Sequence, residues 1–444
     1  MPRYSLSAFL DRWLPRSSIA RSVCLLVSGT AAAQSLAILA SPLLTRIYTP
    51  GEFGILQIFI SLMSMTVVAA SGRYEVAILL PDDEQAAIDV LVLALACVAV
   101  VTLVCIGLVF GLQYYWILPS SMRALRPSLW LLPVSILGGG IYQVLNFWAV
   151  RRGDYKQIAK SKLMQATLQV TTQIGAGLLA HGPIGLLVGD SIGRISGSSR
   201  FIRDLWRDHR GQLCNVRIRR MATYAMRYRR YPLISVWGAL INSSGLALPS
   251  LFLAQYYGAE NTGWFALVNR VMGVPTALIG MSLLQVFTAE TARLSRSDPS
   301  KLMHLFLRTS KGMLYFGLAP CALFVFAAPW LFQKIFGHPW REAGEYARYL
   351  ALMFYVSFID SPVTMTLLVL ERQRTQLVWD TSRLALTVAA IAIPFRLGCG
   401  VRIAVISYGF AMAAMYCIHW TQSYYTIGHC MKQFASITPA KAAA

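Results

Sequence analysis

A succession of long apolar stretches constrains this chain more than any other feature of its sequence. A helix needs about 20 predominantly apolar residues to cross a bilayer. Twelve stretches near that length lie along the 444 residues. They are residues 22–44, 54–80, 86–112, 128–150, 162–181, 183–200, 232–257, 263–289, 312–335, 348–370, 383–397 and 402–426. The sequence therefore predicts an all-α, polytopic membrane protein with about twelve transmembrane helices.

Composition agrees with this class. Apolar residues make up 56% of the chain and charged residues 13%, whereas soluble domains average about 45–50% and about 25%. A soluble chain of this length would need several polar surfaces around separate cores. The same numbers exclude a disordered chain, because disorder requires low hydrophobicity and high charge.

The basic residues are distributed unevenly. The chain holds 40 Lys and Arg against 19 Asp and Glu, for a net charge of +21. If both termini are cytoplasmic, most basic residues fall in cytoplasmic segments, above all the ten Arg in residues 200–231. This is the positive-inside pattern of inner-membrane proteins, reinforced by anionic lipid. It predicts a multi-pass protein of the cell inner membrane with cytoplasmic N- and C-termini, and it explains the charge without nucleic acid.

The basic segment also divides the chain into halves of six stretches each. We expect an N-terminal six-helix lobe at 1–200, a cytoplasmic linker at 201–231 and a C-terminal six-helix lobe at 232–444, packed around a central cavity. A faint internal repeat supports the division. Ser41-Pro42-Leu43-Leu44, Tyr48 and Gly54 in the first half echo Pro249-Ser250-Leu251-Phe252, Tyr257 and Gly263 in the second.

Motifs of enzymatic chemistry are missing from the sequence. It contains no nucleotide-binding P-loop, no H-E-x-x-H and no G-x-S-x-G. The eight cysteines show no C-x-x-C pair, so neither a zinc site nor a disulfide framework is expected. We interpret the acidic run Asp82-Asp83-Glu84 as the solvent-exposed start of a helix. Because the external loops are short, we expect no enzyme activity, no metal and no cofactor.

Ionisable residues inside the apolar stretches are the first candidates for a binding site. A charge at the bilayer centre costs about 2.5–3.5 kcal/mol even on lenient scales, so such residues usually face a cavity or a partner. Arg73 and Glu75 form one candidate, unless the second helix ends near Gly72. Arg270 is another, about seven residues into its stretch. Asp190 and Arg194 are four residues apart, and a pair at this spacing can also neutralise itself.

Glycine recurs at every fourth position of the sixth stretch. Gly185, Gly189, Gly193 and Gly197 would form a smooth ridge along one helix face. Such ridges allow a neighbouring helix to approach closely in a membrane. We therefore predict a close helix–helix contact there.

Two segments resemble known proteins. Residues 45–54 (TRIYTPGEFG) with 72–81 (GRYEVAILLP), and the region from Tyr228 to Arg293 with Asn269-Arg270-Val271, are similar to the signatures of Wzx-type polysaccharide flippases. The resemblance implies the fold of the multidrug/oligosaccharidyl-lipid/polysaccharide exporter superfamily, with two lobes around a V-shaped cavity. The implied substrate is an undecaprenyl-pyrophosphate-linked oligosaccharide for lipopolysaccharide or exopolysaccharide synthesis, moved from the cytoplasmic to the outer leaflet by alternating access.

The resemblance also implies a set of ligands. Related lipid-II flippases carry essential arginines on helices that correspond to those of Arg46, Arg73 and Arg270, although Arg46 lies at a helix end. Arginine suits the pyrophosphate because its planar fork bonds phosphate bidentately and keeps its charge when desolvated. We predict that the substrate-binding residues include Arg46, Arg73, Glu75, Asp190, Arg194, Asn242, Asn269 and Arg270. Tyr142, Gln143 and Trp237 could bind sugars.

Three other functions remain open from the sequence. A small-molecule or drug exporter could use the same fold, and an acidic cluster deep in one lobe would favour it. A membrane polymerase or ligase of the same glycan would need larger external loops. A scaffold for a glycan assembly complex is the third. Polymerase and glycosyltransferases of the same pathway are expected partners of a flippase, beside its lipid-linked substrate and membrane lipid.

Overall fold

The protein is described by a computed structural model over residues 18–114, 125–179 and 182–442. Within these ranges the regular elements are helices. Contacts between residues divide the chain into two units. Unit 1 comprises residues 1–47 and 62–240, and unit 2 comprises residues 48–61 and 241–444. Helix α3 (Pro50–Ala70) therefore begins in unit 2 and ends in unit 1.

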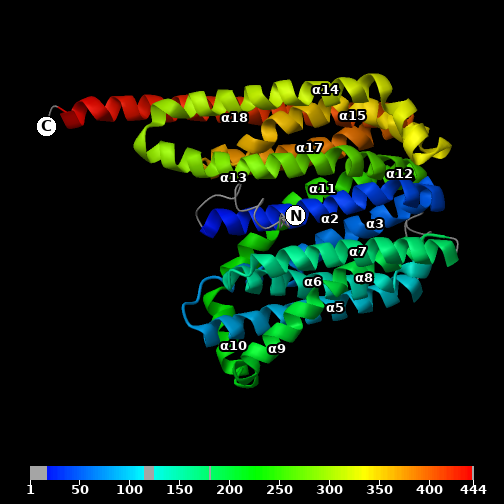
Figure 1. The fold of residues 1–444 in the computed structure, drawn as a ribbon, viewed down its shortest axis with the longest axis horizontal. Helices are drawn as coiled ribbons and strands as arrows, with labels where there is room; N and C mark the ends of the chain where they lie inside the picture. Colours follow the sequence, from blue (N-terminus) through cyan, green and yellow to red (C-terminus); the bar gives the residue numbers. More distant parts are fainter. Residues whose placement is uncertain (1–17, 115–124, 180–181, 443–444) are drawn as a thin grey trace, which may run out of the picture. The chain divides into compact units, whose positions relative to one another are not determined.

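Unit 1 is built from long helices that lie side by side (Figure 1). Helix α2 packs on α7, α7 packs on α8, and α8 packs on α6, which also contacts α5. These helices are α2 (Ser18–Ile47), α5 (Glu84–Tyr114), α6 (Leu131–Arg151), α7 (Tyr155–Leu179) and α8 (Ile184–Ser196). The first turn of α5 is capped by Asp83, whose carboxylate accepts the backbone N–H of Ala86 at 2.9 Å. The acidic run Asp82-Asp83-Glu84 is thus a helix start, as predicted.

The glycine ridge of α8 packs against a row of glutamines on α7. A Cβ added at Gly189, Gly193 or Gly197 would come within 2.4–2.8 Å of Gln173, Gln169 or Gln165 respectively. Because glycine has a hydrogen in place of Cβ, the backbones of α7 and α8 can approach this closely at these three positions. The predicted close helix contact is confirmed, and its partner is a polar helix face that hydropathy alone does not single out.

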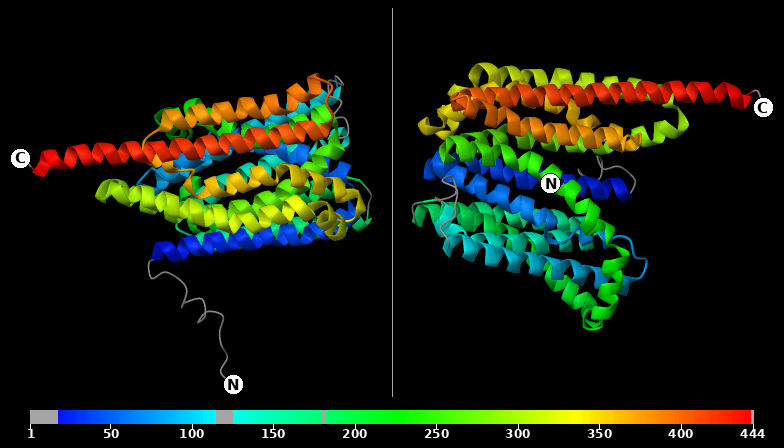
Figure 2. Two further views of the ribbon diagram at one scale, coloured as in Figure 1. Left: turned by 90° about the horizontal axis from the view of Figure 1, so that it is seen from above. Right: turned by 180° about the vertical axis from the view of Figure 1, so that it is seen from behind.

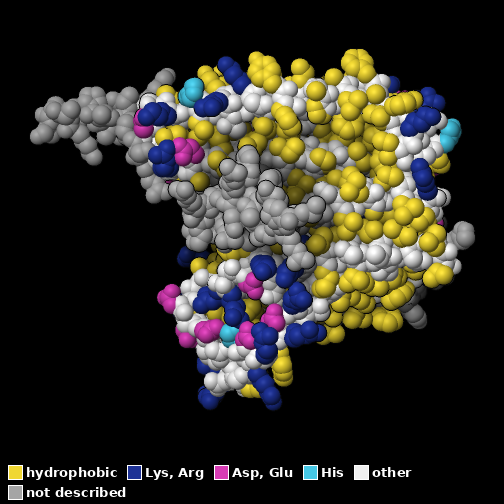
Figure 3. Space-filling model, viewed as in Figure 1, with side chains coloured by type: hydrophobic (Ala, Val, Ile, Leu, Met, Phe, Trp, Pro, Cys, Tyr) yellow, Lys and Arg dark blue, Asp and Glu magenta, His cyan; other side chains and the backbone are white. Residues whose placement is uncertain are grey.

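The basic segment 201–231 folds into helices. Helix α9 (Ser198–Cys214) contacts α5 and α6, and α10 (Ile218–Arg227) contacts α5. Arg220 of α10 lies 3.3 Å from Asp89, whose side chain is fully buried on α5. Figure 3 shows the Lys and Arg side chains that gather over these two helices. The segment predicted as a linker is therefore helical and packs on unit 1, where ion pairs such as Arg220 with Asp89 and Arg152 with Asp208 join it to the bundle.

Unit 2 is a second bundle, in which α14, α15, α17 and α18 lie side by side (Figures 1 and 2). Helix α15 packs on both α14 and α18, and α17 packs on α18. The main helices are α11 (Val236–Tyr257), α12 (Ala259–Val268), α13 (Val274–Ser297), α14 (Leu302–Phe336), α15 (Arg341–Asp360), α16 (Thr366–Val369), α17 (Gln373–Arg396) and α18 (Val401–Ala442). The fully buried aromatic rings of Trp340, Tyr346 and Phe332 fill its interior.

The start of α3 meets α12 at the two glycines of the internal repeat. A Cβ on Gly54 would lie 1.8 Å from the carbonyl oxygen of Ala259, and one on Gly263 would lie 1.8 Å from that of Pro50. Thr49 and Glu52 form a capping box at this end of α3, with the Thr49 N–H 2.7 Å from the Glu52 carboxylate. The sequence echo at Gly54 and Gly263 therefore marks two helices whose backbones touch.

The surface confirms the membrane class. Among the described residues, nine segments are long and apolar enough to cross a bilayer. They are Pro50–Ala70, Glu84–Gln113, Leu131–Arg151, Tyr231–Tyr257, Ala259–Ser295, Leu302–Phe336, His338–Val369, Gln373–Arg396 and Val401–Met431. Large apolar side chains such as Phe110, Phe326 and Leu179 are 69%, 80% and 89% exposed, and Figure 3 shows apolar side chains over the flanks of the helices. Lipid accommodates such a surface, whereas water does not.

The remaining three predicted stretches correspond to α2, α7 and α8 of unit 1. With them the protein is an all-helical polytopic membrane protein of about twelve transmembrane helices. Helix α8 ends at Ser196, and α9 follows after Gly197. Its 13 residues reach only about 20 Å at 1.5 Å each. The predicted span at 183–200 therefore continues into a separate helix.

Several other predicted stretches differ from the helices in their limits, and the second and the eleventh show why. The second was expected to run from 54 to 80, but α3 ends at Ala70 because Gly72 and Arg73 adopt positive φ angles of 60° and 61°. A short helix, α4 (Tyr74–Ala77), follows. The eleventh was expected at 383–397, but α17 begins at Gln373. The first turns of α17 are polar. Asp380 interacts there with Gln376 and Arg383 of the same helix, which supports the helical conformation.

Candidate functional site

The first cluster of buried polar groups lies where α3 ends in unit 1. Glu75 is fully buried on α4. Gln143 of α6 donates a hydrogen bond to its carboxylate at 2.8 Å, and the Ser71 hydroxyl donates another. The Arg73 guanidinium lies 3.3 Å from the same carboxylate. We call Ser71, Arg73, Glu75 and Gln143 the Glu75 cluster.

The backbone of this cluster is strained. Arg73 has a left-handed conformation, which costs an L-residue roughly 1–2 kcal/mol. The turn directs Arg73 back toward Glu75, and Tyr74 fixes it by donating a hydrogen bond to the carbonyl of Ala225 on α10 at 3.1 Å. The side chain of Arg73 stays 28% exposed, and its Nε has no hydrogen-bond partner among the described residues. The cluster thus holds an arginine with unused donor capacity.

The predicted pair of Asp190 and Arg194 is neutral by itself. Arg194 Nε lies 2.7 Å from the Asp190 carboxylate, which also accepts a hydrogen bond from Gln169 at 3.1 Å. The Asp190 side chain is 3% exposed and that of Arg194 is 32% exposed. This arrangement matches the self-neutralising reading that the spacing allowed, because each charge has its partner on the same helix.

Arg46 lies apart from the Glu75 cluster along the chain. It is exposed in the last turn of α2, next to the start of α3. Arg73 follows the opposite end of α3, whose 21 residues extend about 31 Å. One phosphate group cannot reach both arginines, so the structure separates two residues that the resemblance grouped.

Arg270 lies in a distortion of the helix that leads into α13. Residues Asn269–Gly273 form a π-helical turn between α12 and α13, and such turns are frequent at functional sites. Arg270 is half-buried. The side-chain amide of Asn269 donates a hydrogen bond to the carbonyl of Phe265 at 3.0 Å, one turn earlier in the chain.

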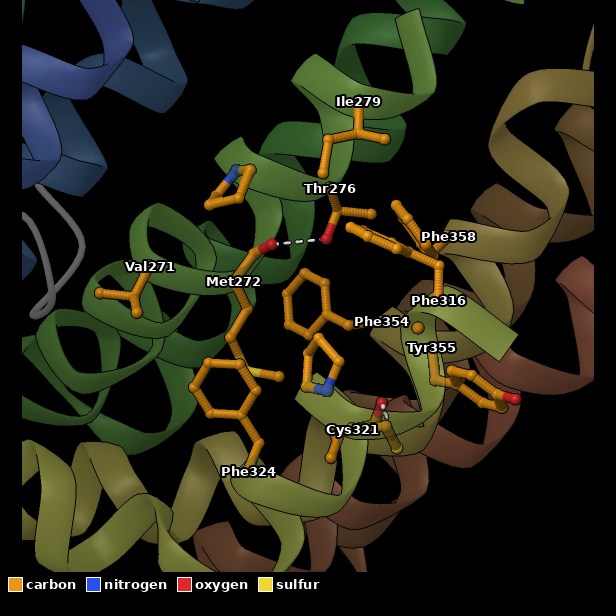
Figure 4. A pocket seen from close by; sticks show the side chains of 14 residues that line it. Val271, Met272, Thr276, Ile279, Phe316, Cys321, Phe324, Phe354, Tyr355 and Phe358 are labelled. Carbon is orange, nitrogen blue, oxygen red and sulfur yellow. Dashed lines mark hydrogen bonds between the residues drawn. The ribbon is translucent and has the colours of Figure 1, made fainter. Parts of the chain in front are cut away.

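An apolar cavity of about 240 Å³ begins directly after Arg270. Helices α13, α14 and α15 surround it, and Figure 4 shows the aromatic rings of Phe316, Phe324, Phe354 and Phe358 around the opening. The only polar bond drawn there from α13 joins the Thr276 hydroxyl to the carbonyl of Met272 at 2.6 Å. The cavity can accept an apolar group.

A second polar cluster crosses unit 2 from α15 to α11. His419 on α18 lies 2.8 Å from Asp360 on α15 through its Nδ1, and its Nε2 lies 3.4 Å from Oε1 of Gln376 on α17. Gln376 donates from its Nε2 to Asp380 at 3.3 Å. Both His419 and Asp360 have side chains only 1% exposed.

The same cluster continues to an arginine. Arg383 lies 3.7 Å from Asp380 and donates a hydrogen bond to Asn242 on α11 at 3.4 Å. Its guanidinium sits 5.0 Å from the ring centre of Trp379, within range of a cation–π contact. Its side chain is 11% exposed. We call Asn242, Asp360, Gln376, Asp380, Arg383 and His419 the Arg383 network.

Sequence reasoning missed most of this network. Arg383 is the first residue of the eleventh predicted stretch, and His419 lies inside the twelfth, where hydropathy gives it no special weight. Asn242 was predicted as a substrate-binding residue. The structure places it beside Arg383, and it places Asp360 beside His419. A histidine inside an apolar span was the signal that could have found the site.

The other polar candidates have local roles. Gln143 bonds to Glu75, the Tyr142 hydroxyl lies 3.3 Å from that of Ser161, and the Trp237 side chain is 64% exposed. In the part of the chain that the structure describes, no three His, Cys, Asp or Glu side chains gather as metal ligands would. The arginines of these clusters can bind an anion.

Comparison with solved structures identifies the fold. A multidrug resistance MATE family transporter of the MOP superfamily, in an inward-facing conformation, is 14% identical, with a TM-score of 0.69 over 90% of this chain and 96% of that one. An outward-facing conformation of such a transporter is 13% identical, with a TM-score of 0.54 over 94% of this chain and 98% of that one. A MOP superfamily transporter from Pyrococcus furiosus, reported to have a reversed binding-pocket polarity, is 14% identical. Its TM-score is 0.55 over 92% of this chain and 96% of that one. The chain has the fold of these membrane transporters.

The family model for polysaccharide biosynthesis proteins matches residues 43–345. The chain therefore belongs to the polysaccharide biosynthesis protein family, in agreement with its resemblance to Wzx-type flippases. The solved structures that share its fold are transporters. No curated protein matches the chain.

Proposed function

We propose that this protein translocates undecaprenyl-pyrophosphate-linked oligosaccharide units across the cell inner membrane, by alternating access, for surface polysaccharide synthesis. The observation that carries the proposal is the family match over residues 43–345 in a chain with a transporter fold. A polysaccharide pathway that assembles its repeat units on a lipid at the cytoplasmic face needs a protein that moves them outward. Lipopolysaccharide and exopolysaccharide are the products to which such units contribute.

The arginines support this substrate. A pyrophosphate that leaves water needs replacement hydrogen bonds, and guanidinium forks supply them while staying charged. Arg73 retains unused donor capacity beside Glu75, and Arg270 lies in a π-helical turn, directly before Val271, which lines an apolar cavity. We assign the anionic part of the substrate to Arg73 and Arg270, and give Asn242 and Asn269 supporting roles. Arg46, Asp190 and Arg194 are weaker candidates on this geometry.

The proposal includes an orientation. Both termini and the basic segment 201–231 lie in the cytoplasm, and residues 1–200 and 232–444 act as the two lobes. The basic residues carry this orientation through the positive-inside rule. Reporter fusions at Asn215 and Pro299 should give cytoplasmic signals, and a fusion at Asn261 an external one. The fourth informative position, Ser120, lies outside the described residues. An external signal at Asn215 would overturn the orientation.

The direct test uses purified protein in sealed vesicles that contain a polyprenyl-pyrophosphate-linked oligosaccharide with a fluorescent sugar. An impermeant glycosidase added outside attacks only the outer leaflet. We expect the protein to make the inner-leaflet fraction accessible as well. The matched control is Arg210→Ala, which removes an exposed arginine of α9, and the test variant is Arg270→Ala. No increase in accessibility with the unaltered protein contradicts the proposal.

A second candidate function is export of small apolar molecules. The aromatic cavity beside α13 favours it, since its volume of about 240 Å³ fits a small ligand. Drug susceptibility of a strain that expresses the protein distinguishes the two functions. A strain that gains drug resistance without restored surface glycan would support the exporter over the flippase.

A further inference from the structure

Helix α10 and the turn after it carry arginines that the proposed substrate contacts do not use. The chain has no Asp or Glu between Asp208 and Glu260, whereas residues 217–230 contain six Arg. Arg220 pairs with Asp89 of α5 at 3.3 Å. The other five are exposed and form no ion pair in the part of the chain that the structure describes; they are Arg217, Arg219, Arg227, Arg229 and Arg230. Five guanidinium groups on this surface can therefore meet an anion from outside the chain.

Three of these arginines surround a hollow in the surface. Its volume is about 640 Å³, and it is lined by Thr223, Met226, Arg227, Arg229 and Arg230. The Arg227 guanidinium lies 5.5 Å from the ring centre of Tyr228, within range of a cation–π contact. Guanidinium groups bind phosphate bidentately through their planar fork. The hollow therefore offers several forks to one phosphate group, with an apolar side chain beside them.

The hollow lies where a transmembrane helix leaves the bilayer. After α10 the chain passes through a π-helical turn at Tyr231–Ser235 into α11, and residues Tyr231–Tyr257 are long and apolar enough to cross a membrane. Helix α10 also lies beside one end of α5 (Figure 1). Tyr74 donates a hydrogen bond to the carbonyl of Ala225 on α10 at 3.1 Å. These contacts hold α10 at the level of the lipid headgroups.

Helix α10 has an exposed apolar stripe. Ile218, Ala222 and Met226 recur at every fourth position, so they lie on one face of the helix. The side chains of Ile218 and Met226 are 85% and 65% exposed. Leu233 and Ile234, at the start of the next span, are 65% and 67% exposed. A helix with arginines and such an apolar face is typical of the boundary between headgroups and acyl chains.

The two features together select the kind of ligand. An acidic soluble protein or a nucleic acid would pair with the arginines, but it would leave Ile218 and Met226 in water. An anionic phospholipid supplies a phosphate for the guanidinium groups and chains for the apolar stripe. Basic segments directly beside a transmembrane helix are attracted to anionic lipids. The chemistry of the surface therefore favours a lipid.

We propose that this hollow binds the phosphate headgroup of an anionic phospholipid. Arg227, Arg229 and Arg230 contact the phosphate, and the apolar stripe of α10 contacts the chains. Arg217 and Arg219 add attraction from a greater distance. The leaflet follows from the orientation proposed above, but the site itself does not depend on which substrate the protein carries.

The first experiment measures lipid binding to the purified full-length protein. Native mass spectrometry counts the molecules of phosphatidylglycerol or phosphatidylcholine that the protein retains as each is titrated into detergent. We expect a clear preference for phosphatidylglycerol. Replacing Arg227, Arg229 and Arg230 by Gln should lower the affinity for phosphatidylglycerol about tenfold or more, with little effect on phosphatidylcholine. Because these arginines form no ion pair, the thermal unfolding temperature should stay the same.

A matched control separates the hollow from net charge. Lys334→Gln, Arg341→Gln and Arg396→Gln together remove three exposed basic residues of unit 2, and this variant should bind phosphatidylglycerol as the wild type does. An equal loss in the two triple variants would mean that overall charge attracts the lipid, and would overturn the proposal. A wild-type protein without any lipid preference would overturn it as well, and would leave the surface to an acidic soluble partner.

The second experiment tests whether the ligand is a phospholipid rather than another phosphate. Ile218→Asn with Met226→Asn keeps every charge and should still weaken phosphatidylglycerol binding severalfold. Glycerol 3-phosphate and inorganic phosphate, which have no chains, should compete poorly. Full competition by either would reassign the hollow to a free anion. Tighter binding of a polyprenyl pyrophosphate than of phosphatidylglycerol would place it on the substrate path, and both results contradict the proposal whether or not the protein moves a glycan.

Discussion

The Glu75 cluster of unit 1 and the Arg383 network of unit 2 combine the same residue types in different ways. Each has a buried acid, a glutamine and an arginine. In unit 1 the carboxylate of Glu75 receives donors from Ser71, Gln143 and Arg73. In unit 2 the ring of His419 lies between the carboxylate of Asp360 and the amide oxygen of Gln376. The first arrangement surrounds one acid with donors, whereas the second links residues of several helices in a chain.

This difference shows that a buried charge in a membrane protein does not by itself indicate substrate binding. The neighbours of the charge decide its role. Asp190 and Arg194 resemble the first arrangement, since each neutralises the other within one helix. Asp360 resembles neither, because its partner is titratable and one of its oxygens lacks a donor in the described part of the chain. The predictions below separate fixed charges from those that meet substrate.

The largest effect is expected at Arg270. Hydrogen bonds to charged groups contribute about 1.5–3 kcal/mol, so Arg270→Ala should lower export about tenfold or more. Arg270→Lys keeps the charge but loses the fork, and should be impaired to a smaller extent. Surface glycan is measured in a strain that lacks its own flippase, with the protein level in the membrane as control. Wild-type export by a stably inserted Arg270→Ala protein would show that Arg270 is not a ligand.

The next effect is expected at Arg383. It contacts a carboxylate, an amide oxygen and an aromatic ring at once, and lysine cannot reproduce that set of contacts. Arg383→Lys and Arg383→Ala should therefore reduce export to a similar extent, unlike the two variants of Arg270. Asn242→Ala is the milder companion variant. Full activity of Arg383→Lys would mean that only the positive charge matters.

A stability effect is expected in the Glu75 cluster. Arg73→Ala leaves Glu75 buried without its cation, which should lower the free energy of unfolding by about 3 kcal/mol. Arg73→Gly should cost about 1 kcal/mol less, because glycine adopts the positive φ without strain. Adding Glu75→Gln to Arg73→Ala should recover much of the loss. Thermal unfolding in detergent measures all three variants, and equal stability of the Ala and Gly proteins would argue against backbone strain at this position.

The smallest effect is expected when Asp190 and Arg194 are changed together. Asp190→Asn with Arg194→Gln removes both charges and keeps similar shapes, so export should stay within about twofold of wild type, as replacement of a whole buried pair is often neutral. Each single change should do more harm, since it leaves one charge alone. Loss of export in the well-inserted double variant would place this pair among the substrate ligands.

Much of the fold could be predicted from the sequence. Runs of about 20 apolar residues, the basic bias and the glycine ridge gave the class, the approximate number of helices and one close helix contact. The limits of the spans were harder. The eleventh stretch was expected to start only at Arg383 because hydropathy counts a charged residue as exposed, although Asp380, Asn242 and Trp379 surround Arg383 in the folded chain.

The sequence by itself determined that this chain must lie in a membrane, because the apolar length of its segments and the scarcity of charge are local properties that no packing can reverse. It also pointed to Arg73, Glu75 and Arg270 as unusual charges. Only the tertiary structure decided their partners. Asp360 and His419 are 59 residues apart and Arg383 and Asn242 are 141 apart. Which side chains meet across such separations depends on how whole helices pack, and that information is absent from any single segment.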